Sequence, residues 1–511
     1  MYRLTSLLVA GTMVLFGTVS GASCVFPAKS FIYVVPDGYG QASQSLARDF
    51  ESIVSGEGTV ERPNSSQIGV DTMVIGSVRT QASNKLVTDS AASATAFACG
   101  IKTYNGAIGV DDDGTPVASI LEAAHLSGFK TGLIATSRIT HATPACYSAH
   151  VLSRGSENEI AAQQIGYSHP FGGPFVDLIM GGGRRQYLPK SAGGKRTDDV
   201  DLVAWAKEKG YTYAEDKSDF EEATEDGKVA LPFLGLFASS HMAYELDRDV
   251  EKEASLLDMT KVAIETLKDA SKDSEQGFFI MVEASRIDHA GHANDAAGHI
   301  HDTLMYNEVM AYLKEFVSAN PDTQLLSAAD HECGGLTVRD GWDPRPLALP
   351  QRTTEYLTDL FVKNKGDDPK AYLKEEILPQ YGLGDLADDK VDALLATYND
   401  KGSGAFMVAL GQAGADKAGI HWSSEKHSSV DVTLYGHAVG KAAIGMKKLI
   451  GGNRNNIELP LYVEKVLNVS LSDATTKLHE NGLGWVQKRE DLAIIKHEAQ
   501  VAAMMHTHGD M

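Results

Sequence analysis

The sequence predicts an α/β fold: a three-layer α/β/α sandwich around a large, mostly parallel central sheet. Three observations point to this class. Short runs of β-branched and aromatic residues are continuous, which is typical of strands buried on both faces. Capped helical segments lie between these runs, and polar residues cluster where the runs stop. The last pattern is expected where a ligand binds at the carboxyl ends of strands in an open sheet.

Four segments have the strand pattern, namely residues 31–35, 132–136, 277–282 and 323–327. Each leads into polar side chains within a few residues. In chain order these polar groups are Asp37, the pair His141 and Thr143, Glu283, and the pair Asp330 and His331. Because ligands of open α/β sheets bind outside the carboxyl ends of the strands, we expect these groups to share one site.

The helical segments carry recognisable end signals. Thr115 is a plausible N-cap for a helix over residues 117–126, with Gly128 in the left-handed position after it. A second helix is expected to open at Ser255, where Asp258 completes a capping box. A third is expected near residues 302–318, because its apolar side chains recur on one helical face.

The ends and the insertion define the expected domain organisation. Residues 1–23 have a basic start, an apolar stretch and a small-residue exit, which predicts a cleaved signal peptide or an uncleaved signal anchor. A lipid-attached Cys24 is a third option. Residues 24–511 are expected to form one domain, with an insertion at about 340–420 where prolines cluster and the strand rhythm stops. No later apolar run reaches the length of about 18 residues needed to span a membrane.

The leader predicts entry into the secretory pathway, with the cell surface, the extracellular space, a vacuole or a periplasm as possible destinations. Sequons for glycosylation begin at Asn64 and Asn468, and they have meaning only in a eukaryotic host. The four cysteines are too few and too dispersed to predict a disulfide framework. Of these, Cys99 and Cys333 are expected to be buried and inert.

The charge balance limits the partners. Lys and Arg total 46 against 68 Asp and Glu, so the net charge is −22. Such a surface repels nucleic acid and anionic lipid. A phosphate-bearing substrate would therefore need a local concentration of positive charge, and bound metal cations supply it more densely than scattered lysines. The composition thus favours metals and excludes a polyanion-binding role.

The strongest single motif is a run of small residues around Asp89 and Ser90, over residues 87–96. If a helix begins at Ser90, its free N–H groups and its dipole point at whatever the serine attacks, which suits a phosphoryl group. The alternative is a tightly packed buried helix that Asp89 merely caps.

Clusters of acids and histidines accompany this motif. Residues 283–292 hold two carboxylates and two histidines, Asp330 and His331 form another group, and His427 lies in a third. Carboxylate and imidazole ligands that arrive from several strand ends favour divalent metal ions. Asp288 and His292 are four residues apart, so a helix would place them on one face.

With these motifs, the sequence resembles the alkaline phosphatase family, and most of all its fungal and other eukaryotic, vacuolar-type members. The resemblance runs from about Lys29 to about Asn468. It includes the Asp37-Gly38 strand end, the serine segment through Gly106, Ala142-Thr143-Pro144, residues 180–183 and the acidic and histidine clusters.

The resemblance implies two Zn²⁺ and one Mg²⁺ per subunit, each with named ligands. The first zinc would be held by Asp288, His292 and His427. The second would be held by Asp37, Asp330 and His331. The magnesium would be held by Asp37, Thr143 and Glu283. Three protein ligands per zinc leave an open position, as catalytic sites do, and oxygen donors alone are what magnesium prefers.

The resemblance further implies hydrolysis of small phosphate monoesters through a phosphorylated Ser90 at alkaline pH, with Arg154 holding the phosphate. Asp89 would support the nucleophile. A homodimer with a crown-like insertion is also implied. Two positions depart from the best-known bacterial pattern: His141 stands in place of an aspartate near the magnesium, and His289 in place of a lysine near the phosphate. We expect a looser third metal site, or a role in pH tuning for both histidines.

Two other functions stay open. One is a related two-metal phosphodiesterase, sulfatase or sugar-phosphate mutase, although the run after Ser90 lacks the arginine of sulfatases and Arg154 suits a dianionic monoester. The other is a non-catalytic descendant that binds phosphate or metal. Every expected ligand is present, and nothing in the sequence favours this second alternative.

Overall fold

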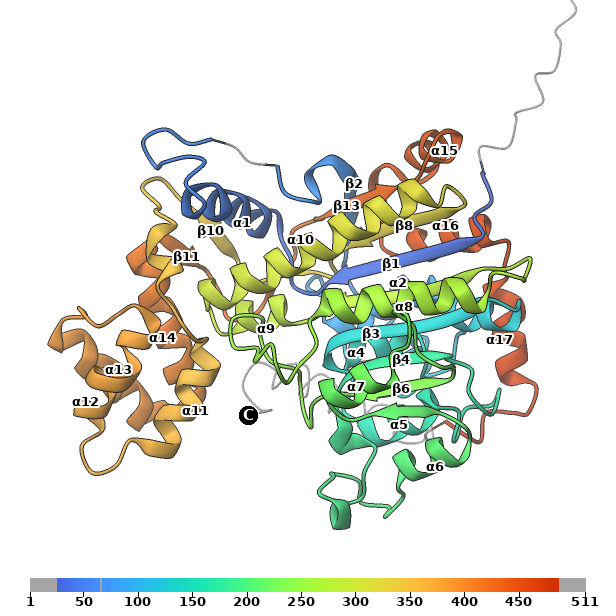
Figure 1. The fold of residues 1–511 in the computed structure, drawn as a ribbon, viewed down its shortest axis with the longest axis horizontal. Coiled ribbons are helices and arrows are strands. Elements are labelled where there is room, and N and C mark those ends of the chain that lie inside the picture. Colours follow the sequence, from blue (N-terminus) through green and yellow to red (C-terminus); the bar gives the residue numbers. More distant parts are fainter. Residues whose placement is uncertain (1–24, 65–66, 487–511) are drawn as a thin grey trace, which may run out of the picture.

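The structure is a computed structural model that describes residues 25–64 and 67–486. Ten strands form the central sheet, in the order β14-β2-β13-β8-β1-β7-β3-β4-β6-β5 (Figure 1). Their bounds are β1 Ser30–Pro36, β2 Val74–Arg79, β3 Lys130–Arg138, β4 Leu178–Gly182, β5 Thr212–Ala214, β6 Phe233–Leu236, β7 Phe278–Ala284, β8 Thr323–Ala328, β13 Val432–His437 and β14 Gly452–Asn455. Only β13 runs antiparallel to its neighbours in this sheet.

The four strands predicted from the sequence are the central neighbours β8, β1, β7 and β3, and all three of their pairings are parallel. Nearly every residue of these strands is buried. A strand covered on both faces has no polar alternation, which explains the continuous apolar runs. The predicted α/β class is confirmed.

Helices cover both faces of the sheet, and the aromatic residues of β1 and β7 show how. Phe31 of β1 is in register with Phe279 of β7 and packs against Tyr462 of α16. The residue before Phe279 in β7, Phe278, packs against Phe316 of α10. Because successive strand side chains point to opposite faces, α16 and α10 lie on opposite sides of the sheet. Helix α8 also packs on β3 and β7.

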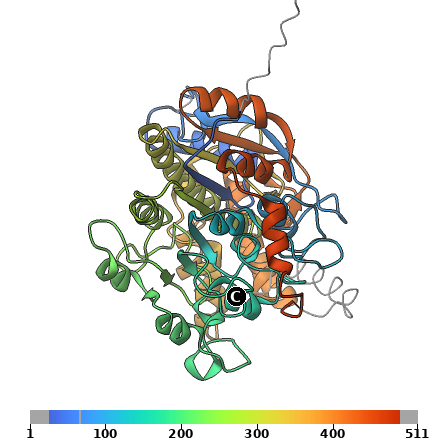
Figure 2. The same cartoon turned by 90° about the vertical axis from the view of Figure 1, so that its right-hand side faces the viewer.

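Figure 2 shows the same fold turned by 90°. The helices of the main body are α1 Gln41–Val54, α2 Ser90–Cys99, α3 Ile120–Leu126, α4 Ala142–Cys146, α5 Glu157–Gln164, α6 Leu202–Glu208, α7 Lys217–Ala223, α8 Leu256–Ala270, α9 Arg286–His292, α10 Ala296–Ala319, α15 Lys441–Ile450, α16 Glu458–Leu467 and α17 Leu471–His479. The Ser255 capping box on α8 is confirmed. Helix α10 begins earlier than predicted, because Asp295 caps it.

The predicted start of the helix over residues 117–126 is wrong. Helix α3 begins at Ile120, where Ser119 and Glu122 form a reciprocal capping box. The backbone N–H groups of residues 117 and 118 donate instead to Gly109 O and to Thr475 Oγ1. These tertiary hydrogen bonds hold the preceding segment out of the helix, so Ser119 and not Thr115 caps α3. Gly128 does adopt the left-handed conformation, with φ +88°.

Residues 354–418 form a group of helices beside the sheet, coloured orange in Figure 1. They are α11 Thr354–Asn364, α12 Pro369–Tyr372, α13 Asp388–Lys401 and α14 Ser403–Ala418. Their apolar side chains make a hydrophobic cluster of their own, which includes Phe361, Tyr381 and Phe406. We call this group of residues the helical insert.

Two small antiparallel sheets complete the fold: β10 Leu336–Val338 pairs with β11 Ile420–Trp422, and β9 Glu332–Cys333 pairs with β12 His427–Ser428. The predicted leader at residues 1–23 and Cys24 lie outside the described residues. Among those that are described, no helix has both the length and the apolarity required to cross a membrane.

Candidate active site

Ser90 is the first residue of α2, at the carboxyl-end side of the sheet. Asp89 caps this helix, because its Oδ1 accepts the backbone N–H of Ala92 at 3.0 Å. All ten residues of α2 are buried, so the small side chains let the helix pack closely against its surroundings. Ser93 anchors the first turn by donating its hydroxyl to the carbonyl of Asp330 at 2.8 Å. The predicted helix start at Ser90 is confirmed.

Arg154 lies beside this helix start and is almost fully buried. Its Nη1 donates to the other carboxyl oxygen of Asp89 at 3.1 Å, and its Nη2 is 3.2 Å from Nε2 of His141. Asp89 therefore holds both the helix that carries Ser90 and the guanidinium next to it. Arg154 Nε has no hydrogen-bond partner within the described ranges.

The side chains of His292, His427 and Asp288 converge, and each of them can donate an electron pair to a metal ion. The Nδ1 of His292 lies 2.7 Å from Glu425 O, and the Nδ1 of His427 lies 3.0 Å from Thr88 O. A carbonyl oxygen can only accept, so each Nδ1 donates. In the neutral imidazoles each Nε2 then carries a lone pair.

These two Nε2 atoms face each other at 3.1 Å, and Asp288 oxygens lie 3.2 Å from Nε2 of His292 and 3.5 Å from Nε2 of His427. Acceptors at such distances repel unless a positive charge lies among them. Burial opposes the charged form of His292, yet the neighbouring Asp288 carboxylate raises the pKa of this imidazole. The group is thus built to surround a cation.

A second group follows strands β1 and β8. Asp37 directly follows β1, while Asp330 and His331 follow β8, and all three are fully buried. His331 Nε2 lies 3.0 Å from Asp330 Oδ2, 3.9 Å from Asp37 Oδ1 and 3.2 Å from the hydroxyl of Ser90. The rings of His331 and His427 stack with their centroids 3.4 Å apart. This group therefore lies next to the group of Asp288, His292 and His427.

Gly38 explains how the chain can pass between these two groups of potential ligands. Its φ of +72° is left-handed, and a Cβ at this position would lie 2.5 Å from the Cα of Asp288. The backbone N–H of Gly38 donates to Asp330 Oδ1 at 3.3 Å. Only glycine allows the end of β1 to approach α9 this closely.

The third group contains Thr143 at the start of α4 and Glu283 near the end of β7. Glu283 Oε2 accepts hydrogen bonds from the hydroxyls of Ser285 at 2.6 Å and Ser137 at 3.1 Å. Buried oxygens remain without a hydrogen-bond partner in the part of the chain that the structure describes: Asp37 Oδ1 and Oδ2, Thr143 Oγ1, Glu283 Oε1, Asp288 Oδ1 and Asp330 Oδ2.

The electrostatics show the cost of this arrangement. Burial and the charges of Asp330, Asp288 and Glu283 raise the pKa of Asp37 well above its usual value. Burial and the neighbouring carboxylates also raise the pKa of Asp330, to about 7. Burial and the adjacent His427 ring hold the pKa of His331 well below its usual value, which keeps a neutral imidazole. Divalent cations would neutralise the carboxylates and coordinate the unpartnered oxygens and nitrogens.

All the predicted ligand positions therefore lie in one buried region beside Ser90, at the carboxyl ends of the central strands. His141 and His289 lie at its edge, with ring centroids 5.6 Å apart. Three features of this region were not predicted from the sequence. The Cys333 thiol belongs to the same potential ligand group as Asp288, His292 and His427. Its position opposite His427 in the β9–β12 pair appears only after folding.

The other two features are Arg286 and Glu355. Arg286 contacts His289 directly, and Glu355 reaches His289 through Arg286. Arg286 lies two residues before Asp288, inside the acidic and histidine run, so its sequence position was a usable signal. Glu355 lies in the helical insert and carried no such signal.

Comparison with known proteins identifies close relatives. The family model described as alkaline phosphatase matches residues 28–469. The repressible alkaline phosphatase of Saccharomyces cerevisiae is 38% identical over 481 residues, covering 88% of this chain and 83% of the relative. An alkaline phosphatase of Schizosaccharomyces pombe is 38% identical over 465 residues, covering 88% and 84%.

Solved structures agree. The cold-active alkaline phosphatase of a psychrophilic Shewanella has a TM-score of 0.70 at 27% identity, covering 86% of this chain and 99% of that one. The alkaline phosphatase of the Antarctic bacterium TAB5 has a TM-score of 0.59 at 27% identity, covering 87% and 99%.

Proposed function

The chain belongs to the alkaline phosphatase family and is a phosphomonoester hydrolase, and on this premise we propose that it acts through a phosphoserine formed at Ser90. The observation that carries the proposal is the buried set of unpartnered carboxylate oxygens and converging imidazole nitrogens next to the Ser90 hydroxyl. Such a set is unstable without cations. The family implies divalent metal cofactors, and the donors present fit them.

We assign the ligands as three groups. Asp288, His292 and His427 would hold one Zn²⁺. Asp37, Asp330 and His331 would hold the second. Asp37, Thr143 and Glu283 would hold Mg²⁺, in keeping with their oxygen donors. When bound, divalent ions supply Lewis-acid stabilisation of negatively charged oxygens.

Ser90 supplies the nucleophile. Its Oγ gives up its proton and forms a bond to phosphorus, the ester P–O bond breaks, and the departing alcohol takes up a proton. Ser90 occupies the start of α2, so the unpaired N–H groups and the helix dipole of this first turn favour the phosphoryl charge. Water then attacks phosphorus from the side that the alcohol left, the bond between phosphorus and Ser90 Oγ breaks, Oγ takes up a proton released by the water, and inorganic phosphate leaves.

Arg154 binds the phosphate in this proposal. Its guanidinium is fixed at one nitrogen by Asp89, while the fork geometry of the remaining N–H groups suits two non-bridging oxygens. A monoester presents a dianionic end to this clamp, whereas a diester has one charge fewer. The clamp therefore favours a phosphomonoesterase over the related phosphodiesterase, and the intact donor set disfavours a non-catalytic descendant.

The test compares the native chain with a Ser90→Ala variant on an aryl phosphate monoester and a matching diester, each with and without a chelator. We expect the native chain to prefer the monoester, to lose activity on chelation and to regain it with Zn²⁺ and Mg²⁺. Ser90→Ala should fall by about 10³-fold or more. Normal turnover by Ser90→Ala, or full resistance to exhaustive chelation, would overturn the mechanism.

Further parts of the proposal concern assembly and location. We propose a homodimer in which the helical insert forms a crown-like subdomain within a catalytic domain of residues 24–511. We also propose that residues 1–23 direct the chain into the secretory pathway, where Asn468 is open to glycosylation in a eukaryotic host. The sedimentation behaviour of the purified chain and the N-terminal sequence of the mature protein test these two points.

A further inference from the structure

A buried arginine connects the helical insert to the edge of the candidate site. The Arg286 side chain is 3% exposed. Its Nη1 lies 2.7 Å from Nδ1 of His289, and its Nη2 donates to Glu355 Oε1 at 2.7 Å. Glu355 lies in the first turn of α11. A residue of the helical insert therefore reaches, through one guanidinium, the side chain that follows Asp288 in the chain.

This contact fixes the chemical form of His289. A guanidinium has no acceptor, so Arg286 donates and Nδ1 of His289 accepts. The neutral imidazole must then carry its proton on Nε2. Its ring meets the ring of His141 edge to face, and Nε2 of His141 is 3.2 Å from Arg154. The Nε2–H donor of His289 thus belongs to the cluster that borders the phosphate clamp.

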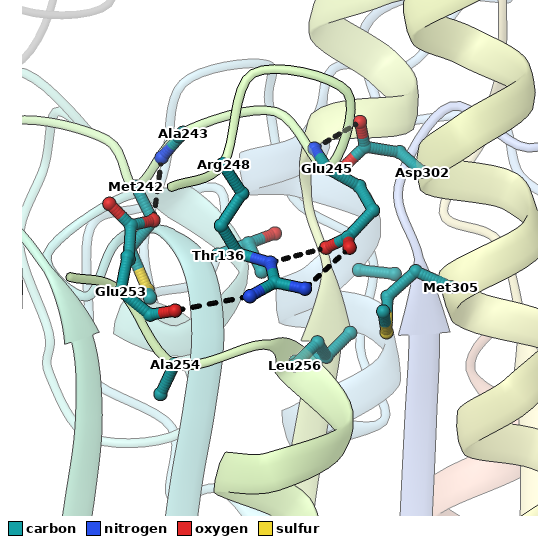
Figure 3. A pocket seen from close by; sticks show the side chains of 11 residues that line it. Thr136, Met242, Ala243, Glu245, Arg248, Glu253, Ala254, Leu256, Asp302 and Met305 are labelled. Carbon is teal, nitrogen blue, oxygen red and sulfur yellow. Dashed lines mark hydrogen bonds and ion pairs between the residues drawn. The ribbon is translucent and has the colours of Figure 1, made fainter. Parts of the chain in front are cut away.

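The position of Arg286 depends on two other contacts. Its guanidinium stacks on the ring of Tyr244 at 3.7 Å. The segment that carries Tyr244 is itself anchored around a small pocket (Figure 3). There the N–H of Glu245 donates to Asp302 at 3.2 Å, and Arg248 pairs with the Glu245 carboxylate at 2.7 Å. Tyr244 therefore offers a fixed platform, and Glu355 offers the only side-chain carboxylate that pairs with Arg286 among the described ion pairs.

We propose that Glu355 is a positioning residue for phosphate-ester hydrolysis: it orients Arg286, which sets the tautomer and direction of His289 next to His141, the neighbour of Arg154. The inference rests on the proposed function of the site. A planar fork needs a partner on each side to hold one rotamer, and without Glu355 the guanidinium would be free to turn toward solvent at the α11 side. His289 could then adopt either tautomer, and its N–H donor would no longer be held in one direction.

The experiment uses Glu355→Ala and Glu355→Gln in the full chain, with Glu375→Ala as the matched control. Glu375 is an exposed glutamate of the same insert, away from this contact. We expect Glu355→Ala to lower kcat/KM for an aryl phosphate about tenfold and to weaken inhibition by inorganic phosphate by a similar factor. Glu355→Gln keeps an acceptor oxygen and should lose less, and Glu375→Ala should match the native chain.

A double-mutant cycle with His289→Ala separates positioning from general damage. If Glu355 acts through His289, the double variant is no slower than His289→Ala alone, because the second change removes nothing further. Losses that multiply, or a His289→Ala variant with native kcat/KM and phosphate inhibition, would overturn the proposal. Metal content and melting temperature are measured for each variant, and Glu355→Gln carries the test if Glu355→Ala does not fold. Failure of the proposed function would show instead as Ser90-independent turnover.

Discussion

His292 and His427 meet Nε2 to Nε2 at 3.1 Å, although 135 positions separate them in the chain. Each ring is oriented by donating its other nitrogen to a backbone carbonyl, of Glu425 and of Thr88 respectively. Because the backbone sets both tautomers, the lone pairs point at a common centre whether or not a ligand is present.

The first prediction follows from this facing pair and concerns metal removal. Exhaustive chelation should lower the melting temperature, because buried carboxylates and lone pairs then repel one another without compensation. A ligand present at about 100 times its Kd adds about 2.7 kcal/mol to the free energy of unfolding, so re-addition of Zn²⁺ should restore several degrees. Differential scanning calorimetry checks this. An unchanged transition after verified metal loss would contradict the assigned ligand set.

The second prediction separates the two contacts of Asp89. Asn at this position still caps α2, but it loses the negative charge that faces Arg154. We expect Asp89→Asn to raise KM about tenfold with little loss of stability, and Asp89→Ala to lose about a further 1 kcal/mol of unfolding free energy.

Asp216→Ala is the control for this pair, since Asp216 caps α7 without any contact to the site. It should cost stability and leave KM unchanged. Urea unfolding and steady-state kinetics on the same preparations supply both numbers. Equal KM values for Asp89→Asn and the native chain would show that the carboxylate charge does not orient Arg154.

The third prediction concerns pH and the buried pair of Glu122 and His150, whose Oε1 and Nε2 lie 2.9 Å apart. Burial alone would raise the pKa of Glu122, but the imidazoles of His150 and His169 hold it well below its usual value. Burial alone would lower the pKa of His150, but Glu122 and Gly109 O raise it.

The directions of these two pKa shifts define a pH window in which the pair stabilises the fold. The lowered pKa of Glu122 gives stability that is present above its ordinary value of 4.5 and is lost as pH falls. The raised pKa of His150 gives stability that is complete below 6.5 and is lost as pH rises. Glu122→Gln should therefore cost most between these values, about 3 kcal/mol, and less at about pH 9.

Chemical unfolding across pH, relative to the native chain, measures this difference and removes effects common to both proteins. Glu221→Gln in α7 is the control, because Glu221 is exposed. The difference in unfolding free energy between this variant and the native chain should stay near zero across the pH range. A Glu122→Gln deficit that is constant from acid to alkaline pH would mean that Glu122 and His150 do not form an ion pair.

The fourth prediction uses two left-handed glycines. Gly38→Ala should remove activity and weaken metal binding, since its Cβ would meet Asp288 at 2.5 Å. Gly128→Ala meets nothing within 4 Å and should cost only the backbone strain, about 1–2 kcal/mol. Metal content and kcat for both variants provide the check. An active, metal-loaded Gly38→Ala protein would show that β1 can move away from α9.

Local patterns predicted much of the fold. The central strands were legible because a strand buried on both faces has to be apolar throughout, and the start of α2 was legible because a small-residue run followed a capping aspartate. The start of α3 was misjudged. Thr115 and Ser119 are both acceptable caps in isolation. The backbone N–H groups of Val117 and Ala118 donate to Gly109 O and Thr475 Oγ1, both outside the helix, and these hydrogen bonds decided between the two caps.

The sequence by itself determined which residue types are present, that the strands end in acids and histidines, and that a serine opens a helix. Only the tertiary structure decided which carbonyl orients each imidazole, that Cys333 lies opposite His427, and that Glu355 of the insert reaches Arg286. The physical reason is range. Periodicity and capping act over a few residues, whereas tautomers, charge pairing and ligand geometry depend on atoms that meet only when distant segments pack together.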